Sequence, residues 1–213
     1  MRGLYPILDL DALSSSGFAP LEFAERVLEA RPPLLQLRAK NAPARSVLAL
    51  LRTLGPLCRR VGTRLFANDR PDLAVLAGAE GVHLGQSDLP PAEARRFAPE
   101  LLLGLSTHDL DELERALAER PAYVAFGPVF PTRSKARPEP VVGLELLARA
   151  GERARAAGIP LVAIGGIDVE RAPLVAPHAP LGCAIAALLA PTLDEVAARA
   201  HALAAPFDGE PRA

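Results

Sequence analysis

Two hydroxyl and two cationic side chains follow a strand-like run in the second half of the chain. Residues 123–135 read YVAFGPVFPTRSK, an apolar run that breaks at a Gly-Pro pair and ends in Thr132, Arg133, Ser134 and Lys135. Hydroxyls and cations at the end of a buried strand are suited to binding an oxyanion such as a phosphate. A solvated loop after a core strand has the same composition, so the rest of the chain has to separate the two interpretations.

A second polar group alternates with apolar residues in the segment QLRAK. Gln36, Arg38 and Lys40 are spaced by two, which places them on one side of a strand. The apolar residues before them indicate burial, and buried cations need an anionic partner such as a ligand phosphate. A surface edge strand is the alternative. Lys40 and Lys135 are the only lysines among 24 basic residues, which suggests positions where an ammonium cannot be replaced by a guanidinium.

Two carboxylates follow neighbouring strand-like runs, Asp69 after 64–68 and Asp88 after 81–84. Mg²⁺ prefers oxygen ligands and is commonly held by one or two carboxylates together with substrate phosphates. The alternative is that each aspartate caps the helix that follows it. Asn68, next to Asp69, is suited to an amide contact with a ligand or to a turn.

Further candidates lie at the ends of other predicted strands. Ser106 could bond a ligand, and His108 could act as a base or only orient the start of the next helix. No Ser-His-Asp arrangement has the spacing of a nucleophile elbow. Gly166 and the Ala186-Ala187 pair could bring backbone N–H groups to an anion, in the loops where barrels often bind phosphate.

Strand-like and helix-like runs alternate along the whole chain, which predicts an α/β protein with a single (β/α)8 TIM barrel. We expect one domain over residues 1–205, a loop at 10–19 and a loose tail over 206–213. The predicted strands are 4–9, 34–39, 64–68, 81–84, 101–106, the run from 123, 161–165 and 182–186. The predicted helices are 20–30, 43–60, 71–77, 91–97, 109–119, 144–157, 169–176 and 192–204.

The composition argues against several classes of partner. The net charge of −1 and pI near 6.4 give no general attraction to nucleic acid or to an anionic membrane. No apolar run reaches 18 residues, and the N-terminus does not resemble a secretory signal. Cys58 and Cys183 are expected to be reduced thiols in a cytoplasmic protein. The sequence leaves the oligomeric state open, and a homo-oligomer is compatible with it.

With these residues assembled, the chain resembles the thiamine phosphate synthase family over almost its whole length. Six segments follow the family's signatures in order: QLRAK at 36–40, ANDRPDLA at 67–74, GVHLGQSDLP at 81–90, GLSTH at 104–108, GPVFPTRSK at 127–135 and AIGGI at 163–167. The resemblance implies a barrel enzyme that joins a hydroxymethylpyrimidine diphosphate to a thiazole phosphate and releases pyrophosphate. It also implies Mg²⁺ as the cofactor.

The resemblance assigns roles by position. The pyrimidine diphosphate would be bound by Gln36, Leu37, Arg38, Ala39, Lys40, Asn68, Ser106 and Lys135. The catalytic residues would be Arg38, Lys40, Ser106 and Lys135, and the metal ligands would be Asp69 and Asp88. The thiazole phosphate would be received by Thr132, Arg133, Ser134, Gly166, Ala186 and Ala187.

The chain departs from the family pattern at two positions. Ser134 stands where the family usually has threonine, which keeps the hydroxyl. Ala187 stands where a serine is common, and the loss of one hydrogen bond to a charged group is worth about 1.5–3 kcal/mol. Two other interpretations remain: a thiazole tautomerase on the same barrel, using His108 for proton transfer, and a catalytically silent barrel that binds a phosphorylated ligand.

Overall fold

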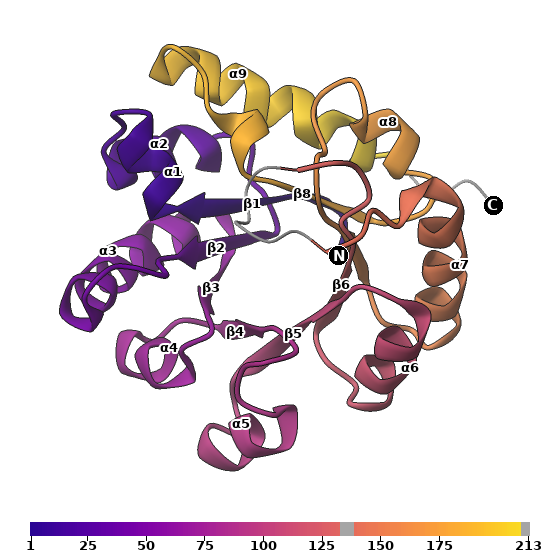
Figure 1. Cartoon of the computed structure of the whole chain (residues 1–213). Coiled ribbons are helices and arrows are strands. Elements are labelled where there is room, and N and C mark those ends of the chain that lie inside the picture. The colour runs from indigo at the N-terminus through magenta and orange to yellow at the C-terminus, as the bar shows by residue number, and fades with distance from the viewer. Residues whose placement is uncertain (133–138, 210–213) are drawn as a thin grey trace.

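The structure is a computed structural model that describes residues 1–132 and 139–209. Within these ranges, eight parallel strands close into a barrel in chain order, and β1 pairs with both β2 and β8. The predicted barrel is therefore confirmed (Figure 1). The strands are β1 (Gly3–Asp9), β2 (Leu34–Arg38), β3 (Arg64–Asn68), β4 (Gly81–Leu84), β5 (Leu102–Thr107), β6 (Tyr123–Phe126), β7 (Leu161–Ala163) and β8 (Leu181–Ala184).

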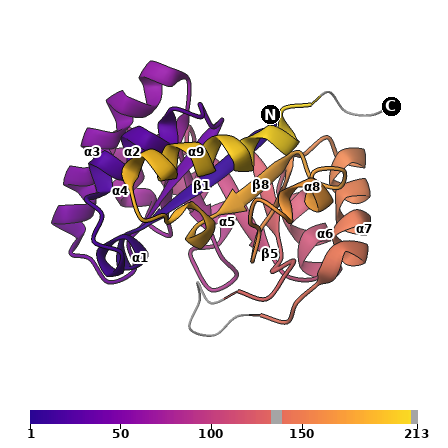
Figure 2. The ribbon, with the colours of Figure 1, turned by 90° about the horizontal axis from the view of Figure 1, so that it is seen from above.

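The helices surround the barrel, and α1 lies at the end opposite the N-terminus (Figure 2). They are α1 (Leu10–Ser15), α2 (Pro20–Leu28), α3 (Ala44–Val61), α4 (Pro71–Ala77), α5 (Pro91–Phe97), α6 (Leu110–Ala118), α7 (Gly143–Ala156), α8 (Ala172–Val175) and α9 (Leu193–Ala204), with short 3-10 turns η1 (Ala186–Leu188) and η2 (Ala205–Phe207). In the described part of the chain, no helix is both long enough and apolar enough to cross a membrane.

Local sequence signals explain where two of these helices begin. The Asp109 carboxylate accepts a hydrogen bond from the Glu112 backbone N–H at 2.7 Å. Thr192 Oγ1 accepts from the Glu195 backbone N–H at 3.3 Å. Both contacts satisfy N–H groups that have no partner within the first helical turn, and they make Asp109 and Thr192 the N-caps of α6 and α9.

Two expectations about chain segments need correction. The predicted loop at 10–19 contains α1, because Asp9 caps a helix that starts directly after β1. The segment from 206 is not loose throughout, since Phe207 is fully buried. Its ring lies where a side chain on Gly182 of β8 would stand, 2.2 Å from the position of a Cβ. An aromatic anchor therefore holds the chain against the barrel as far as residue 207.

Large rings fill the inside of the barrel, and glycines make room for them. Phe66 and Tyr123 are fully buried in the barrel interior. A Cβ on Gly81 would lie 2.3 Å from the Phe66 ring, and one on Gly104 would lie 2.1 Å from Tyr123 Cζ. A separate apolar core lies between the strands and the outer helices. The barrel is thus filled with side chains, and ligands must bind at its mouth.

Candidate active site

A cavity of about 1230 Å³ opens at the carboxyl ends of the strands. The structure brings most of the predicted site residues into its wall, although they are spread over the chain from 36 to 187. These are Gln36, Arg38, Lys40, Asn68, Asp69, Asp88, Ser106, Thr132, Gly166, Ala186 and Ala187. The remaining members of the predicted loop, Arg133, Ser134 and Lys135, lie outside the described residues.

Two predicted binding residues do not line the cavity. Gln36, Arg38 and Lys40 do line it, as the two-residue period predicts. Leu37 points the other way and is buried in the core between strands and helices. Ala39 also packs against that core. Alternation along an extended chain sends neighbouring side chains to opposite faces, so Leu37 and Ala39 have no side-chain contact with the cavity.

Arg38 is held by a carboxylate that the sequence marks only as the end of the first strand. Asp9 is 5% exposed and also lines the cavity. Its Oδ1 accepts hydrogen bonds from the backbone N–H groups of Asp11 and Ala12, each at 3.1 Å, at the start of α1. Its Oδ2 accepts from the Arg38 guanidinium. Asp9 therefore joins the start of α1 to the cation at the end of β2.

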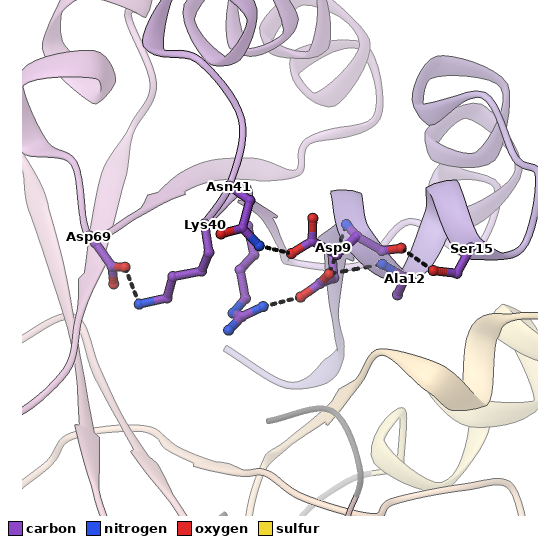
Figure 3. Close-up of polar contacts among 8 residues, drawn as sticks. Asp9, Ala12, Ser15, Lys40, Asn41 and Asp69 are labelled. Carbon is purple, nitrogen blue, oxygen red and sulfur yellow. Dashed lines mark hydrogen bonds and ion pairs between the residues drawn. The ribbon is translucent and has the colours of Figure 1, made fainter. Parts of the chain in front are cut away.

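The two candidate metal ligands lie together with Lys40. Lys40 Nζ is 2.5 Å from Asp69 Oδ2, and Figure 3 shows the lysine side chain extending across the strand ends to reach it. Asp88 Oδ2 accepts a hydrogen bond from the Gly85 backbone N–H at 2.7 Å. Burial raises the pKa of Asp88, and its contact with the Asp69 carboxylate raises it further. One cation and two mutually repelling carboxylates thus occupy one corner of the cavity.

The helix-capping explanation for these aspartates is wrong in this structure. The N-cap of α4 is Arg70 and that of α5 is Pro90, and neither helix start has a side-chain cap hydrogen bond. Asp69 also has a φ of 62°, a left-handed conformation that costs a non-glycine residue free energy. Strain at a cavity-lining carboxylate is typical of a residue held for binding rather than for helix initiation.

A line of buried hydrogen bonds connects two further cavity residues. Ser106 Oγ is 2.8 Å from His83 Nε2, and His83 Nδ1 is 2.9 Å from the Tyr123 hydroxyl. The Tyr123 hydroxyl is 2.5 Å from that of Tyr5, which accepts from Gln36 Nε2 at 2.7 Å. Sequence analysis missed His83, Tyr5 and Tyr123, although a histidine inside a predicted barrel strand is itself a signal.

The opposite wall is formed by the loops after β6, β7 and β8. Gly165 and Gly166 have φ values of 99° and 64°, which favour glycine. A Cβ on Gly166 would lie 2.5 Å from the carbonyl oxygen of Pro131, so the two loops touch at backbone distance. Ala186 and Ala187 lie in η1 after β8.

Arg171 is another cavity residue that the sequence did not single out. It lines the cavity, and its guanidinium donates to the Gly166 carbonyl at 2.8 Å. The same group stands 5.0 Å from the centre of the Phe130 ring. Two contacts therefore place a cation beside the glycine pair.

His108 lines the cavity and is tied to the helix that follows it. Its Nδ1 lies 2.9 Å from Glu112 Oε2, and its backbone N–H donates to the same oxygen at 2.7 Å. The orienting role considered for His108 is thus present, and Nε2 is the ring atom left to face the cavity.

Comparisons with known proteins give one consistent result. A family model described as thiamine monophosphate synthase matches residues 4–189. A thiamine-phosphate synthase from Anaeromyxobacter dehalogenans is 44% identical over 191 residues, covering 89% of this chain and 79% of the relative. One from Chlorobium luteolum is 39% identical over 192 residues, covering 89% of both. The solved structure of a thiamine phosphate pyrophosphorylase from Pyrococcus furiosus superposes with a TM-score of 0.83 at 32% identity, covering 95% of this chain and 93% of that one.

Proposed function

The chain belongs to the thiamine monophosphate synthase family and acts as a thiamine-phosphate synthase, a transferase, and on this basis we propose its substrates, metal and site residues. It joins 4-amino-2-methyl-5-(diphosphooxymethyl)pyrimidine to a thiazole phosphate and releases pyrophosphate, with Mg²⁺ as cofactor. The observation that carries the proposal is the common wall of one cavity: it contains the cations of Arg38 and Lys40 and the carboxylates of Asp69 and Asp88, and Lys40 pairs with Asp69. Two cations and two oxygen ligands suit a magnesium diphosphate.

The pyrimidine diphosphate binds along β2 to β5. Arg38 and Lys40 contact the diphosphate, Gln36, Asn68 and Ser106 contact the ring, and Lys135 completes the diphosphate site. All of these except Lys135 are described, and all described members line the cavity. Arg38 is well suited because Asp9 orients its guanidinium, and a fixed fork of donors matches phosphate geometry.

The donor set at Asp69 and Asp88 fits Mg²⁺. Both ligands are carboxylate oxygens, and Mg²⁺ is usually held by one or two carboxylates, waters and substrate phosphates. Within residues 1–132 and 139–209, no group of three or more His, Cys, Asp or Glu side chains could hold a metal ion. The metal is therefore expected to depend on the diphosphate for part of its coordination. Lys40 forms an ion pair with Asp69, one of these two carboxylates.

The thiazole phosphate binds at the opposite wall. Gly166 and the Ala186-Ala187 turn offer backbone N–H groups, and the Thr132 side chain faces the same cavity. Arg133 and Ser134 are assigned here from the family pattern alone. Since Ala187 offers no hydroxyl, the phosphate is held by one hydrogen bond fewer than in relatives with serine at this position.

The mechanism is a dissociative displacement. As pyrophosphate departs, negative charge builds on its oxygens, and Arg38 and Lys40 stabilise that charge from positions fixed before the reaction. Bound Mg²⁺ supplies additional charge stabilisation to the leaving group. The thiazole nitrogen attacks the pyrimidine-stabilised cation with its own lone pair. No general base is needed, which agrees with the role of His108 as a partner of Glu112.

The test is a coupling assay with both purified precursors, measuring thiamine phosphate and pyrophosphate with Mg²⁺ and with EDTA. We expect product only with the metal. Asp69→Asn should lose at least about a hundredfold in kcat/KM, because it removes a charged ligand. Asp72→Asn is the matched control, since Asp72 lies nearby but pairs with Arg70 at the surface. Absence of coupling, together with metal-independent thiazole isomerisation that His108→Ala abolishes, would instead establish the tautomerase.

A further inference from the structure

Two side chains in the cavity wall are connected through the inside of the barrel. Gln36 and Ser106 both line the cavity. Between them run the hydrogen bonds of Tyr5, Tyr123 and His83, at 2.7, 2.5, 2.9 and 2.8 Å in order from Gln36 to Ser106. We call these five residues the buried hydrogen-bond chain. Because both of its ends face the ligand site, what happens at one end has consequences at the other.

The donor and acceptor properties of these groups determine the direction in which the hydrogen bonds of the buried hydrogen-bond chain are donated. Gln36 presents Nε2 to Tyr5, and an amide nitrogen can only donate, so the Tyr5 proton is directed to Tyr123. The Tyr123 proton is then directed to His83 Nδ1. A neutral imidazole has one N–H, which must therefore be on Nε2 and donate to Ser106 Oγ.

This direction determines what the two ends offer to a ligand. Gln36 keeps its Oε1, an acceptor, for the cavity. Ser106 accepts from His83, so its own hydroxyl proton is available to donate. The tyrosines support the arrangement because burial raises the pKa of Tyr5 and of Tyr123 well above the usual range. Both hydroxyls therefore stay protonated at any pH at which the enzyme works.

We propose that the buried hydrogen-bond chain selects an amino-substituted pyrimidine and rejects the corresponding oxo compound, with Tyr5, Tyr123 and His83 as positioning residues. The inference rests on the proposed function, in which Gln36 and Ser106 contact the pyrimidine. Gln36 Oε1 accepts from the exocyclic amino group, and the Ser106 hydroxyl donates to N1, the ring nitrogen opposite the amino-bearing carbon.

An oxo group in place of the amino group conflicts with the chain at both ends. The oxo group needs a donor, so the Gln36 amide would have to rotate and present Oε1 to Tyr5. Every hydrogen bond would then reverse, and Ser106 would donate to His83. In the 4(3H)-oxo ring N1 carries no proton, so it would face a serine lone pair instead of a hydroxyl proton. The buried hydrogen-bond chain thus couples the Gln36 and Ser106 contacts, which would otherwise adjust independently. The oxo compound leaves a polar group unpaired, and the free-energy cost of that group makes the site selective.

The barrel interior is built to hold this chain. A Cβ on Gly104 would lie 2.1 Å from Tyr123 Cζ, so the Tyr123 ring occupies the space of a side chain on β5. The Tyr123 ring stacks on His83 with 9° between the ring planes and packs edge-on against Tyr5. These contacts hold the rings in line, and among the described residues no buried side-chain polar atom lacks a partner.

The kinetic test compares the 4-amino and 4-oxo pyrimidine diphosphates as substrates of the full-length enzyme. The quantity is the ratio of their kcat/KM values, measured for wild type and for Tyr123→Phe. Intrinsic reactivity of the two compounds cancels when the ratios are compared. We expect Tyr123→Phe to reduce the preference for the amino compound by about tenfold or more, because His83 loses the donor that fixes its tautomer. An unchanged ratio would overturn the proposal.

The matched control is Thr63→Val. Thr63 is 2% exposed, and its hydroxyl donates to the Pro32 carbonyl at 2.6 Å, outside the chain. The Thr63→Val variant also loses a buried hydrogen bond, but its ratio of kcat/KM values for the two pyrimidines should stay at the wild-type value. A reduced ratio in this control would show that general destabilisation, and not the buried hydrogen-bond chain, affects selectivity.

A spectroscopic test measures the tautomer of His83 in the buried hydrogen-bond chain and does not require turnover. In protein labelled with ¹⁵N-histidine, the His83 signals are assigned by their loss in His83→Gln. With a 4-aminopyrimidine bound, Nε2 should be protonated and Nδ1 bare, and Tyr123→Phe should shift this balance. A protonated Nδ1 in the wild type would overturn the proposal. If the enzyme fails to couple its precursors but this tautomer is found, the proposed function is wrong, whereas the direction assigned to the buried hydrogen-bond chain is confirmed.

Discussion

The Arg38–Asp9 pair can be broken from either side, with different consequences. Arg38→Met removes the cation and leaves a long apolar side chain, whereas Asp9→Asn keeps the cation and the N-cap oxygen of α1. The side chains are 18% and 6% exposed, so this pair is much less solvated than a surface ion pair. Both variants should lose the ion pair, but only Arg38→Met should lose the group that stabilises the leaving pyrophosphate.

The burial of the pair determines the magnitude. A hydrogen bond to a charged group is worth about 1.5–3 kcal/mol, and we expect this coupling energy from a double-mutant cycle on the free energy of unfolding. A single variant that loses this amount of stability should show a decrease in Tm of about 3–12 °C for a chain of this length. In kcat/KM, Arg38→Met should lose at least about a hundredfold, in line with the loss of a preorganised electrostatic contact. Asp9→Asn should lose less than about tenfold.

The assay combines urea unfolding of the four proteins of the cycle with the coupling assay. The Glu93–Arg96 pair on α5 is the control, because its side chains are 51% and 78% exposed. Such a pair is worth about 0.3–0.5 kcal/mol. A coupling energy for Arg38–Asp9 no larger than this control would refute the structural reasoning. Equal losses of activity in the two single variants would refute the separate role of the cation.

Three further predictions follow from the described contacts. Because the folded-state pKa of Asp88 is raised, the metal-free protein loses stability as pH rises through that pKa. Asp88→Asn should remove this loss. The variant's free energy of unfolding in urea should therefore rise relative to that of wild type as the pH increases. Phe207→Ala empties a fully buried site against Gly182 and should cost about 3–5 kcal/mol in unfolding free energy, whereas a tail that is loose from 206 would give no change. Gly104→Ala places a methyl group 2.1 Å from Tyr123 Cζ and should lower Tm and displace the Tyr123 ring in a crystal structure; unchanged stability would contradict the packing described.

Sequence reasoning predicted the barrel and much of the cavity wall because those signals are local. Alternating strand-like and helix-like runs need no knowledge of distant contacts. The period of two placed Gln36, Arg38 and Lys40 on one face, and parallel strands bring their carboxyl ends to one mouth. The sequence therefore predicts that Asp69 and Asp88 lie near one another.

The features that sequence reasoning did not predict depend on contacts between distant residues. A polar residue next to an apolar run can start a helix, so a helix within 10–19 was compatible with the sequence. The contact between Asp9 and Arg38, however, appears only in the closed barrel. Phe207 follows a predicted helix end, and its burial depends on a glycine in β8 that lies 25 positions earlier.

By itself, the sequence determined which residues stand at the strand ends, since strand period and order are properties of neighbouring residues. Only the tertiary structure decided which of them meet. Closing the barrel brings β1 beside β8 and directs side chains from separate strands into one interior. Gln36, Tyr5, Tyr123, His83 and Ser106 come from five strands, and no spacing along the chain relates them. Their hydrogen bonds exist because a closed barrel excludes water, which leaves buried polar groups to pair with one another.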